Sequence, residues 1–333
     1  MLAGRLNIRT RVLSMEEVPT PHAGPGEVRI KVAAAGVCLS DVHLIEGSLT
    51  PRRLSGDTVT LGHENAGTID EVGEGVSGIT AGQRVLLRAG EPRDGVVFTR
   101  GVDYDGGWAE YAVARADTVV PIPDSLPFEQ ASFIPDAVST PWAAITTTAQ
   151  TQPARAVGVW GIGGLGAHAI QLLRLVGAAP LIAVDPLPAA RERALAFGAD
   201  IALDPADEQF DQAVTNATRG TGLGTAFDFA GVPEVREQAI RCLGENGKLV
   251  LVGLSDQPIT VTDGIRFSYL GQQILGHYGS RAEHVEQLVT LAELGRLDLS
   301  RSVSEILPLS EAPEAVRRLA SKQGNPIRII LRP

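Results

Sequence analysis

The first part of the chain, to about residue 135, contains short runs in which apolar and polar positions alternate. In residues 27–32 apolar and charged side chains alternate with a period of two, which is typical of a strand with one buried face. Similar runs occupy residues 68–72, 84–87 and 109–113, and glycine-rich turns separate them. Short strands interrupted by glycine predict a small barrel or sandwich in this region.

A different pattern, in which strands alternate with helices, begins after residue 153. It predicts a strand and a helix in turn at 156–160, 165–176, 181–184, 189–197, 226–229, 235–243 and 248–252. This alternation predicts a doubly wound parallel sheet. A mostly helical segment at 128–148, broken at Pro141, precedes the region. A helix at 282–294 and a strand at 327–331 are expected after it.

The size and charge of the chain exclude several classes of protein. Its 333 residues predict about two domains, and 44% hydrophobic with 20% charged residues indicates a globular protein rather than a disordered one. A net charge of −10 opposes binding to a nucleic acid backbone. The longest apolar stretch, 165–184, is interrupted by polar side chains, so we expect no membrane span and no membrane partner.

Cysteine usage and the N-terminal residues predict a cytoplasmic location. Cys38 and Cys242 are the two cysteines, too few for a disulfide framework, which favours a reducing compartment. Residues 1–10 contain two arginines and lack the apolar core of a signal peptide. We therefore expect a soluble cytoplasmic protein, and an enzyme fits these features best.

A glycine-rich loop follows the expected strand at 156–160. The sequence there is Gly161-Ile162-Gly163-Gly164-Leu165-Gly166, followed by an apolar helix. This spacing is that of a dinucleotide-binding loop: Gly161 allows a tight turn, Gly163 lets a pyrophosphate approach the backbone, and Gly166 lets the helix pack on the strand. The helix N-terminus then offers free N–H groups to the phosphates. A glycine-rich turn used only for packing is the alternative.

An acidic residue strengthens the dinucleotide interpretation. The next expected strand ends in Asp185, 19 residues beyond Gly166, where a carboxylate can accept hydrogen bonds from both ribose hydroxyls. The same carboxylate repels a 2′-phosphate, so the sequence favours NAD over NADP. Arg191 leaves the NADP alternative open, because a nearby arginine can accommodate that phosphate.

A set of potential metal ligands lies in the first part of the chain. Cys38, Ser40, Asp41 and His43 occur within six positions, and His63-Glu64 follows. A thiolate together with an imidazole favours zinc, and a catalytic zinc needs three protein ligands and one open position. Composition alone also allows Cys38 to be a small buried apolar residue and His63 to be a core histidine.

Four motifs together resemble one known family. They are Gly36-Val-Cys-Leu-Ser-Asp-Val-His43, Gly62-His63-Glu64, Asp105-Gly-Gly-Trp-Ala-Glu-Tyr111 and the glycine loop. In this order and at these separations they are similar to the zinc-dependent alcohol dehydrogenases of the medium-chain dehydrogenase/reductase superfamily. The resemblance covers essentially the whole chain. It implies an α/β protein with a GroES-like β-rich catalytic domain, residues 1–137 and 280–333, and a central Rossmann NAD-binding domain, residues 138–279.

The resemblance implies one catalytic zinc. Cys38 and His63 match its first two protein ligands, and Asp136 stands where many members have the third ligand, a cysteine. A carboxylate oxygen is an acceptable but harder zinc ligand. Glu64 matches a residue beside the metal or an alternate ligand, and Asp41 matches the carboxylate that orients a ligating histidine.

Two departures from the family pattern change the expected contacts. Many relatives bind a second, structural zinc through four cysteines, but residues 85–106 contain no cysteine. We therefore expect no structural zinc and a plain loop at 90–104. Leu39 stands where some relatives have a basic residue that touches the pyrophosphate, which leaves Arg328 as the matching cation on the phosphate side.

The resemblance also implies a mechanism. Zinc lowers the pKa of a bound alcohol, and Ser40 takes its proton, which passes through the nicotinamide ribose to His43 and solvent while hydride moves to the nicotinamide. The implied cofactor contacts are Gly161, Gly163, Gly164, Leu165, Gly166, Asp185, Arg191, Arg328, Thr140, Ala230 and the segment Val252-Gly253-Leu254, which contacts the carboxamide. The implied pocket residues are Trp108, Leu49 and Trp142.

The resulting hypothesis is a zinc- and NAD-dependent alcohol dehydrogenase, or ketone or aldehyde reductase. Its partners are a small alcohol or carbonyl substrate and a second copy of the chain, in a homodimer or homotetramer. One alternative keeps the fold but reduces an activated C=C bond with NAD(P)H and no metal. Another alternative binds NAD without transferring hydride. Retention of the cysteine, histidine and aspartate together argues against both.

Overall fold

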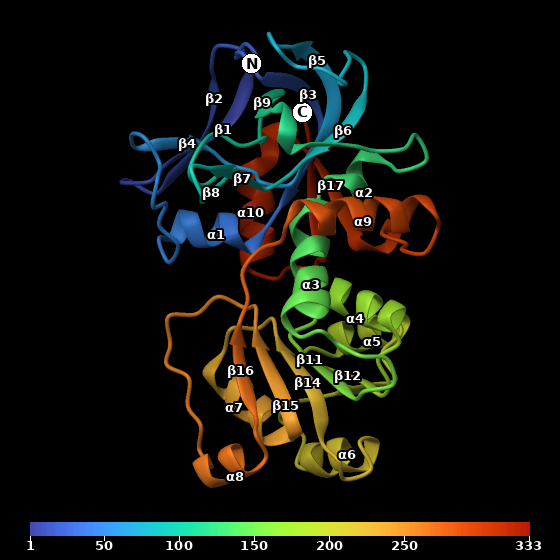
Figure 1. Cartoon of the computed structure of the whole chain (residues 1–333). Coiled ribbons are helices and arrows are strands. Elements are labelled where there is room, and N and C mark those ends of the chain that lie inside the picture. Colours follow the sequence, from blue (N-terminus) through green and yellow to red (C-terminus); the bar gives the residue numbers. More distant parts are fainter. The chain divides into compact units, whose positions relative to one another are not determined.

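The computed structural model describes residues 1–333, and the chain divides into two compact units (Figure 1). Unit 1 comprises Met1–Ser139 and Ser280–Pro333, and unit 2 comprises Thr140–Gly279. The chain therefore leaves unit 1, builds unit 2, and returns to unit 1. None of its helices combines the length and apolar character needed to cross a bilayer.

Unit 1 is built around a sheet of seven strands. They are β3 (Glu27–Val37), β5 (Asn65–Val72), β6 (Arg84–Leu87), β9 (Tyr111–Arg115), β10 (Val119–Pro121), β17 (Val303–Pro308) and β18 (Arg328–Arg332). The order is β10-β6-β5-β3-β18-β17, with β9 also paired to β3. Because β18 pairs antiparallel to β3 and parallel to β17, residues from both ends of the chain share one sheet.

Smaller elements complete unit 1. Strands β1 (Leu2–Asn7), β2 (Val12–Glu17) and β4 (Thr58–Thr60) form a three-stranded sheet, and β7 (Gly90–Arg93) pairs with β8 (Val96–Thr99). The helices are α1 (Leu39–Glu46), α2 (Phe128–Ala131), a π-helical turn η2 (Ile134–Val138), α9 (Ala282–Glu293) and α10 (Ala312–Ala320), with short 3-10 turns at Ala116–Thr118, Ser300–Ser302 and Leu309–Glu311. Val28, Ile30 and Val32 of β3 are buried, as the period of two predicts.

Unit 2 contains the parallel sheet that the alternating pattern predicted. Its strands are β11 (Val157–Trp160), β12 (Leu181–Val184), β13 (Ile201–Leu203), β14 (Leu223–Asp228), β15 (Leu243–Leu251) and β16 (Gln273–Gly276). Its helices are α4 (Gly164–Val176), α5 (Pro188–Ala196), α6 (Phe210–Ala217), α7 (Pro233–Cys242) and α8 (Gly264–Tyr269). All pairings are parallel, in the order β13-β12-β11-β14-β15-β16. This is the Rossmann order, which reverses direction between β11 and β14, where such folds bind dinucleotides.

The expectation of a break at Pro141 was wrong. Helix α3 (Ser139–Ala143) runs through this proline, and π-helical turns precede and follow it at Ile134–Val138 and Ala144–Thr148. The π-helical turn directly before α3 changes the backbone hydrogen-bonding pattern ahead of Pro141, which fits a proline without an N–H inside a continuing helix. The helices α1 and α10 were not anticipated.

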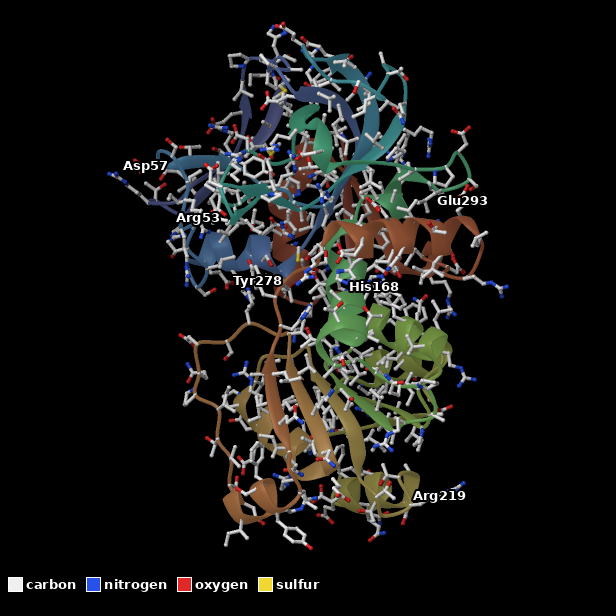
Figure 2. All side chains as sticks on the ribbon, in the orientation of Figure 1. Arg53, Asp57, His168, Arg219, Tyr278 and Glu293 are labelled. Atoms are coloured by element: carbon white, nitrogen blue, oxygen red, sulfur yellow. The ribbon has the colours of Figure 1, made fainter.

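The expectation of a plain loop at 90–104 was also wrong, because this segment begins with the β7–β8 hairpin. The Arg93 guanidinium lies 4.8 Å from the centroid of the Phe98 ring and 4.7 Å from that of Tyr104. Arg53, labelled in Figure 2, lies 5.6 Å from the Phe98 ring centroid. Arginines stacked on aromatic rings therefore order a segment that carries little hydrophobic periodicity.

Candidate functional site

Four potential metal-ligating side chains meet in unit 1. Cys38 follows β3 at the N-cap of α1, His63 and Glu64 immediately precede β5, and Asp136 lies in the π-helical turn η2. One donor atom from each lies within 4.8 Å of the others. We call Cys38, His63, Glu64 and Asp136 the donor cluster. The structure thus brings together the four residues that the sequence placed near a zinc ion.

The spacing within the donor cluster fits a zinc ion. Cys38 Sγ and His63 Nε2 each lie 3.4 Å from Asp136 Oδ2. Two ligand atoms of a tetrahedral zinc, each about 2.0–2.3 Å from the metal, are about 3.3–3.8 Å apart, so these separations match. A thiol, an imidazole and a carboxylate are also all zinc ligands of proteins.

Burial and neighbouring charges shift the protonation of these groups. Burial raises the pKa of the Cys38 thiol, and the Asp136 carboxylate raises it further. Burial alone would lower the pKa of His63, but the Asp41 carboxylate and contacts with Asp136 and Cys38 raise it well above its usual range. Burial would raise the pKa of Asp136, yet the hydrogen bond and charge of His63 lower it. The donor cluster therefore stabilises a positive charge among acidic groups.

Asp41 supports two members of the donor cluster. Its buried carboxylate accepts a hydrogen bond from the Cys38 backbone N–H at 2.9 Å, which caps the first turn of α1. Its other oxygen lies 3.6 Å from His63 Nδ1. Burial raises the pKa of Asp41, and His63 opposes that shift. The 3.6 Å separation is longer than a hydrogen bond, so the histidine-orienting role that the family resemblance implied stays a prediction.

Glu64 and Arg328 form a buried ion pair beside the donor cluster. Arg328 Nη2 lies 2.9 Å from Glu64 Oε1, and both side chains are almost fully buried. Burial raises the pKa of Glu64, and the Arg328 charge opposes this rise. The expected phosphate contact of Arg328 is therefore not favoured, because the guanidinium is 2% exposed and is already engaged by a carboxylate.

The proposed proton-transfer residues lie on α1. Ser40 and His43 are three positions apart, so their side chains lie on the same side of this helix. The Ser40 hydroxyl oxygen is 3.7 Å from Cys38 Sγ, which places it at the donor cluster. Leu39 is exposed, and Leu49, a proposed pocket residue, is half-buried beyond the end of α1.

Trp108 packs in the core and does not line a pocket as expected. Its side chain has no exposed surface, and its indole N–H donates a hydrogen bond to the Gly36 carbonyl at 3.0 Å. Its position in the family pattern suggested a pocket wall, but the side chain is fully buried and its polar atom already has a protein partner. Trp142, the other aromatic residue of that prediction, is half-buried in α3.

The glycine loop in unit 2 has the expected conformation. It links β11 to α4, whose N-cap is Gly163. A Cβ atom on Gly166 would lie 1.8 Å from the Gly161 carbonyl oxygen, so only glycine lets the helix approach the strand this closely. Gly163 is exposed, with open space where a side chain would be. A phosphate group can therefore reach the backbone here.

Asp185 and Arg191 lie at the end of β12. The Asp185 carboxylate accepts hydrogen bonds from the N–H groups of Ile162 and Leu187, which connects it to the glycine loop. Arg191 donates to the carbonyls of Asp185 and Pro186 and pairs with Asp204 at 2.9 Å. All three contacts are made through Nη1, so this nitrogen, rather than the whole guanidinium, is taken up by protein acceptors.

The remaining proposed cofactor contacts also lie in unit 2. Thr140 is buried, and its carbonyl is 3.0 Å from His277 Nε2. Ala230 follows β14, and Val252, Gly253 and Leu254 follow β15, so these residues lie beyond the carboxyl ends of adjacent parallel strands. Asp228 and Arg236, which contact these segments, were missed because neither residue belongs to a recognisable motif.

Comparison with known proteins decides the family. Residues 24–124 match the model of the alcohol dehydrogenase GroES-like domain, and residues 164–293 match that of zinc-binding dehydrogenases. An alcohol dehydrogenase of Geobacillus stearothermophilus is 30% identical over 340 residues, with 96% of each chain covered. The chain belongs to the zinc-binding alcohol dehydrogenase family. The fold and the family predicted from sequence are thereby confirmed.

Other members of the zinc-binding alcohol dehydrogenase family support this assignment. An NAD-dependent alcohol dehydrogenase of Sulfurisphaera tokodaii is 29% identical over 344 residues, which cover 96% of each chain. The crystal structure of the alcohol dehydrogenase of Aeropyrum pernix has a TM-score of 0.88 and 30% identity, with both chains covered completely. The comparisons favour the alcohol dehydrogenase hypothesis over a metal-independent C=C reductase.

Proposed function

We propose that this chain is a zinc- and NAD-dependent alcohol dehydrogenase that interconverts a small alcohol and the corresponding carbonyl compound. The observation that carries the proposal is the buried donor cluster, with Cys38 Sγ and His63 Nε2 each 3.4 Å from Asp136 Oδ2. A metal-independent reductase has no need of such a set, because burying a thiol, an imidazole and a carboxylate together is costly without a cation.

Cys38, His63 and Asp136 would hold the zinc ion. When bound, zinc supplies Lewis acidity that lowers the pKa of a substrate hydroxyl or polarises a carbonyl. The Asp41 carboxylate, 3.6 Å from His63 Nδ1, would attract that side of the ring, while Nε2 faces Asp136. Glu64 contributes a carboxylate that Arg328 neutralises, which makes it a neighbour of the metal site rather than a fourth permanent ligand.

Ser40 and His43 would move the substrate proton. The Ser40 hydroxyl, next to Cys38 Sγ, would accept the proton of the alcohol and release its own. The His43 imidazole would carry the released proton to water. Ser40 and His43 are three positions apart on α1, so both side chains lie on one side of the helix, where a proton can pass between their surroundings.

Unit 2 would bind NAD. The glycine loop and the N-terminus of α4 would hold the pyrophosphate, and Asp185 would accept hydrogen bonds from the adenosine ribose. The Asp185 carboxylate would repel a 2′-phosphate, which supports NAD over NADP, and Arg191 Nη1 is held by Asp204 and by two carbonyls. A relative whose name includes NAD dependence supports the same choice. Ala230 and the segment Val252-Gly253-Leu254 would contact the nicotinamide end.

Three further features belong to this proposal. The GroES-like domain comprises residues 1–137 and 280–333, and the Rossmann domain comprises residues 138–279. The enzyme is a cytoplasmic homodimer or homotetramer. Analytical ultracentrifugation of the purified chain tests the oligomeric state, and limited proteolysis tests the domain limits.

Metal content and turnover test the proposed activity. Elemental analysis of purified protein should give about one zinc per chain, since a single donor cluster is present. The reduction of NAD should be measured with a panel of primary and secondary alcohols, before and after zinc removal by a chelator. Loss of turnover on chelation, with recovery when zinc is added, supports the proposal. Turnover that survives complete zinc removal contradicts it and favours the metal-independent reductase.

A further inference from the structure

Two loops in unit 2 pack against each other beyond the carboxyl ends of β14 and β15. A Cβ atom on Gly231 would lie 2.6 Å from the Leu254 carbonyl oxygen, and one on Gly253 would lie 2.4 Å from the Gly231 nitrogen. The Gly253 and Val252 N–H groups also donate to the Asp228 carbonyl, at 2.7 and 2.9 Å. The two loops therefore form a single backbone surface, in which a small shift of one displaces the other.

A buried carboxylate holds the first of these loops. Asp228 is the last residue of β14, and its side chain has no exposed surface. Its Oδ1 accepts hydrogen bonds from the N–H groups of Ala230 and Gly231, at 2.9 and 2.8 Å. Its Oδ2 accepts from Arg236 Nε at 2.9 Å. A charge-assisted bond to each N–H fixes the turn more firmly than a neutral acceptor would.

A buried guanidinium joins this turn to the second loop. Arg236 lies on α7, and its side chain is only 4% exposed. Besides binding Asp228 through Nε, it donates to the Gly253 carbonyl through Nη2, at 3.2 Å, and to the Gln257 carbonyl through Nη1, at 3.4 Å. The planar fork of arginine can reach these three acceptors together, whereas a lysine ammonium has no such fork.

Neither charge is needed merely to fill the core. Removing a carboxylate and a guanidinium from water is costly, and a well-packed apolar pair would be as stable or more stable. A buried ion pair of this kind is better explained by the geometry that it specifies. Apart from the bond between Asp228 and Arg236, every hydrogen bond of these two side chains is made to the backbone of residue 230, 231, 253 or 257.

We infer that Asp228 and Arg236 are positioning residues for the nicotinamide end of the cofactor. This inference rests on the proposed function, which places Ala230 and Val252-Gly253-Leu254 against nicotinamide. Arg236 does not contact the cofactor itself, because its three nitrogens are engaged by protein acceptors. The pair acts by fixing two backbone segments before the cofactor arrives, so that binding does not have to order them.

Binding measurements on two variants and one control test the inference. Arg236→Lys keeps the positive charge but loses the fork, and Asp228→Asn keeps an oxygen acceptor for the turn but turns an amide toward Arg236. Arg266→Lys is the matched control. Arg266 also donates to a backbone carbonyl in unit 2, that of Leu243, but Leu243 lies at the N-terminal end of β15, the end opposite to residues 252–254. Figure 1 shows α8, which carries Arg266, at the lower end of the sheet of unit 2.

The ligands compared are NADH and ADP-ribose, which lacks the nicotinamide. Fluorescence titration should give an NADH Kd raised about tenfold or more for Arg236→Lys and Asp228→Asn, while ADP-ribose binds within about twofold of wild type. Arg266→Lys should change neither Kd by more than about twofold. All titrations are run well below the measured unfolding midpoint of each variant.

Specific results would overturn the inference. Unchanged NADH binding in both variants, or equal weakening of NADH and ADP-ribose, assigns the pair a structural role only. If Arg236→Lys does not fold, the Asp228→Asn titrations decide alone. A wild-type chain that binds ADP-ribose and NADH equally well contradicts a nicotinamide subsite here. A wild-type chain that binds neither ligand contradicts the proposed function itself, so the two failures are distinguishable.

Discussion

Arg328 Nη2 lies 2.9 Å from Glu64 Oε1, inside the core of unit 1 and next to the donor cluster. The pair joins distant parts of the sequence, because Arg328 begins β18 while Glu64 precedes β5. Glu64 Oε1 also accepts a hydrogen bond from the Ala137 N–H at 3.2 Å, in the same helical turn as Asp136. The ion pair thereby connects the C-terminal segment to the turn that presents the proposed third zinc ligand.

Removing one partner of this ion pair should destabilise unit 1. Arg328→Met leaves the buried Glu64 without its cation, and breaking such a pair costs about 3–5 kcal/mol. The double variant Arg328→Met with Glu64→Gln removes both charges and should recover a substantial part of the loss. Urea unfolding followed by tryptophan fluorescence measures both. A single variant as stable as wild type would show that the charges are compensated by other groups.

Zinc binding should depend on the Asp136 carboxylate, the proposed third ligand. Asp136→Asn replaces a carboxylate with a neutral amide, so zinc affinity should fall by about 100-fold or more. Asp136→Cys supplies a thiolate, a softer zinc ligand, and should retain the metal. Competition with a chromogenic chelator measures the affinity of each variant for zinc.

Glu64→Gln provides the control for the ligand assignment. Because Glu64 is paired with Arg328, its loss should weaken zinc binding much less than Asp136→Asn does. If the two variants lose zinc equally, Glu64 is a ligand in its own right. Retention of zinc by Asp136→Asn would contradict the ligand set itself.

Asp204 should contribute to the preference for NAD. It holds Arg191 at 2.9 Å, and the two side chains are only partly exposed. Asp204→Asn weakens this hold and removes a negative charge near the adenosine ribose site, so NADPH should bind up to about fivefold more tightly, the scale of one exposed ion pair. NADH binding should stay close to wild type.

The double variant Asp204→Asn with Arg191→Ala is the matched control. It should lose any gain for NADPH, because the arginine that would receive the 2′-phosphate is absent. Fluorescence titration with both reduced cofactors measures the effect. An equal gain for NADPH in the double variant would show that the removed charge acts without Arg191.

The parts of the site that depend on local sequence could be predicted. The glycine loop, Asp185 and the Cys38 segment are each defined by residue types at short spacings, and the period of two in β3 or the alternation in unit 2 reflects local packing. Asp228 and Arg236 could not be predicted, because their partners are backbone atoms of another loop. The burial of Arg328 likewise follows from the insertion of β18 beside β3, which no local pattern encodes.

Trp108 should act on stability rather than on substrate choice. The buried indole N–H donates to the Gly36 carbonyl, two residues before Cys38, so the ring supports the end of β3 from the core. Trp108→Phe removes the donor and leaves that carbonyl unpaired, which should cost about 1–3 kcal/mol before any loss of packing. The KM values for small and bulky alcohols should keep their wild-type ratio, because the ring has no exposed surface.

Leu49→Ala, at a half-buried position beyond α1, is the comparison variant for a pocket residue. Steady-state kinetics with both alcohols, alongside urea unfolding, separates the two roles. A Trp108→Phe enzyme that is fully stable but changes its ratio of KM values would return this residue to the substrate pocket.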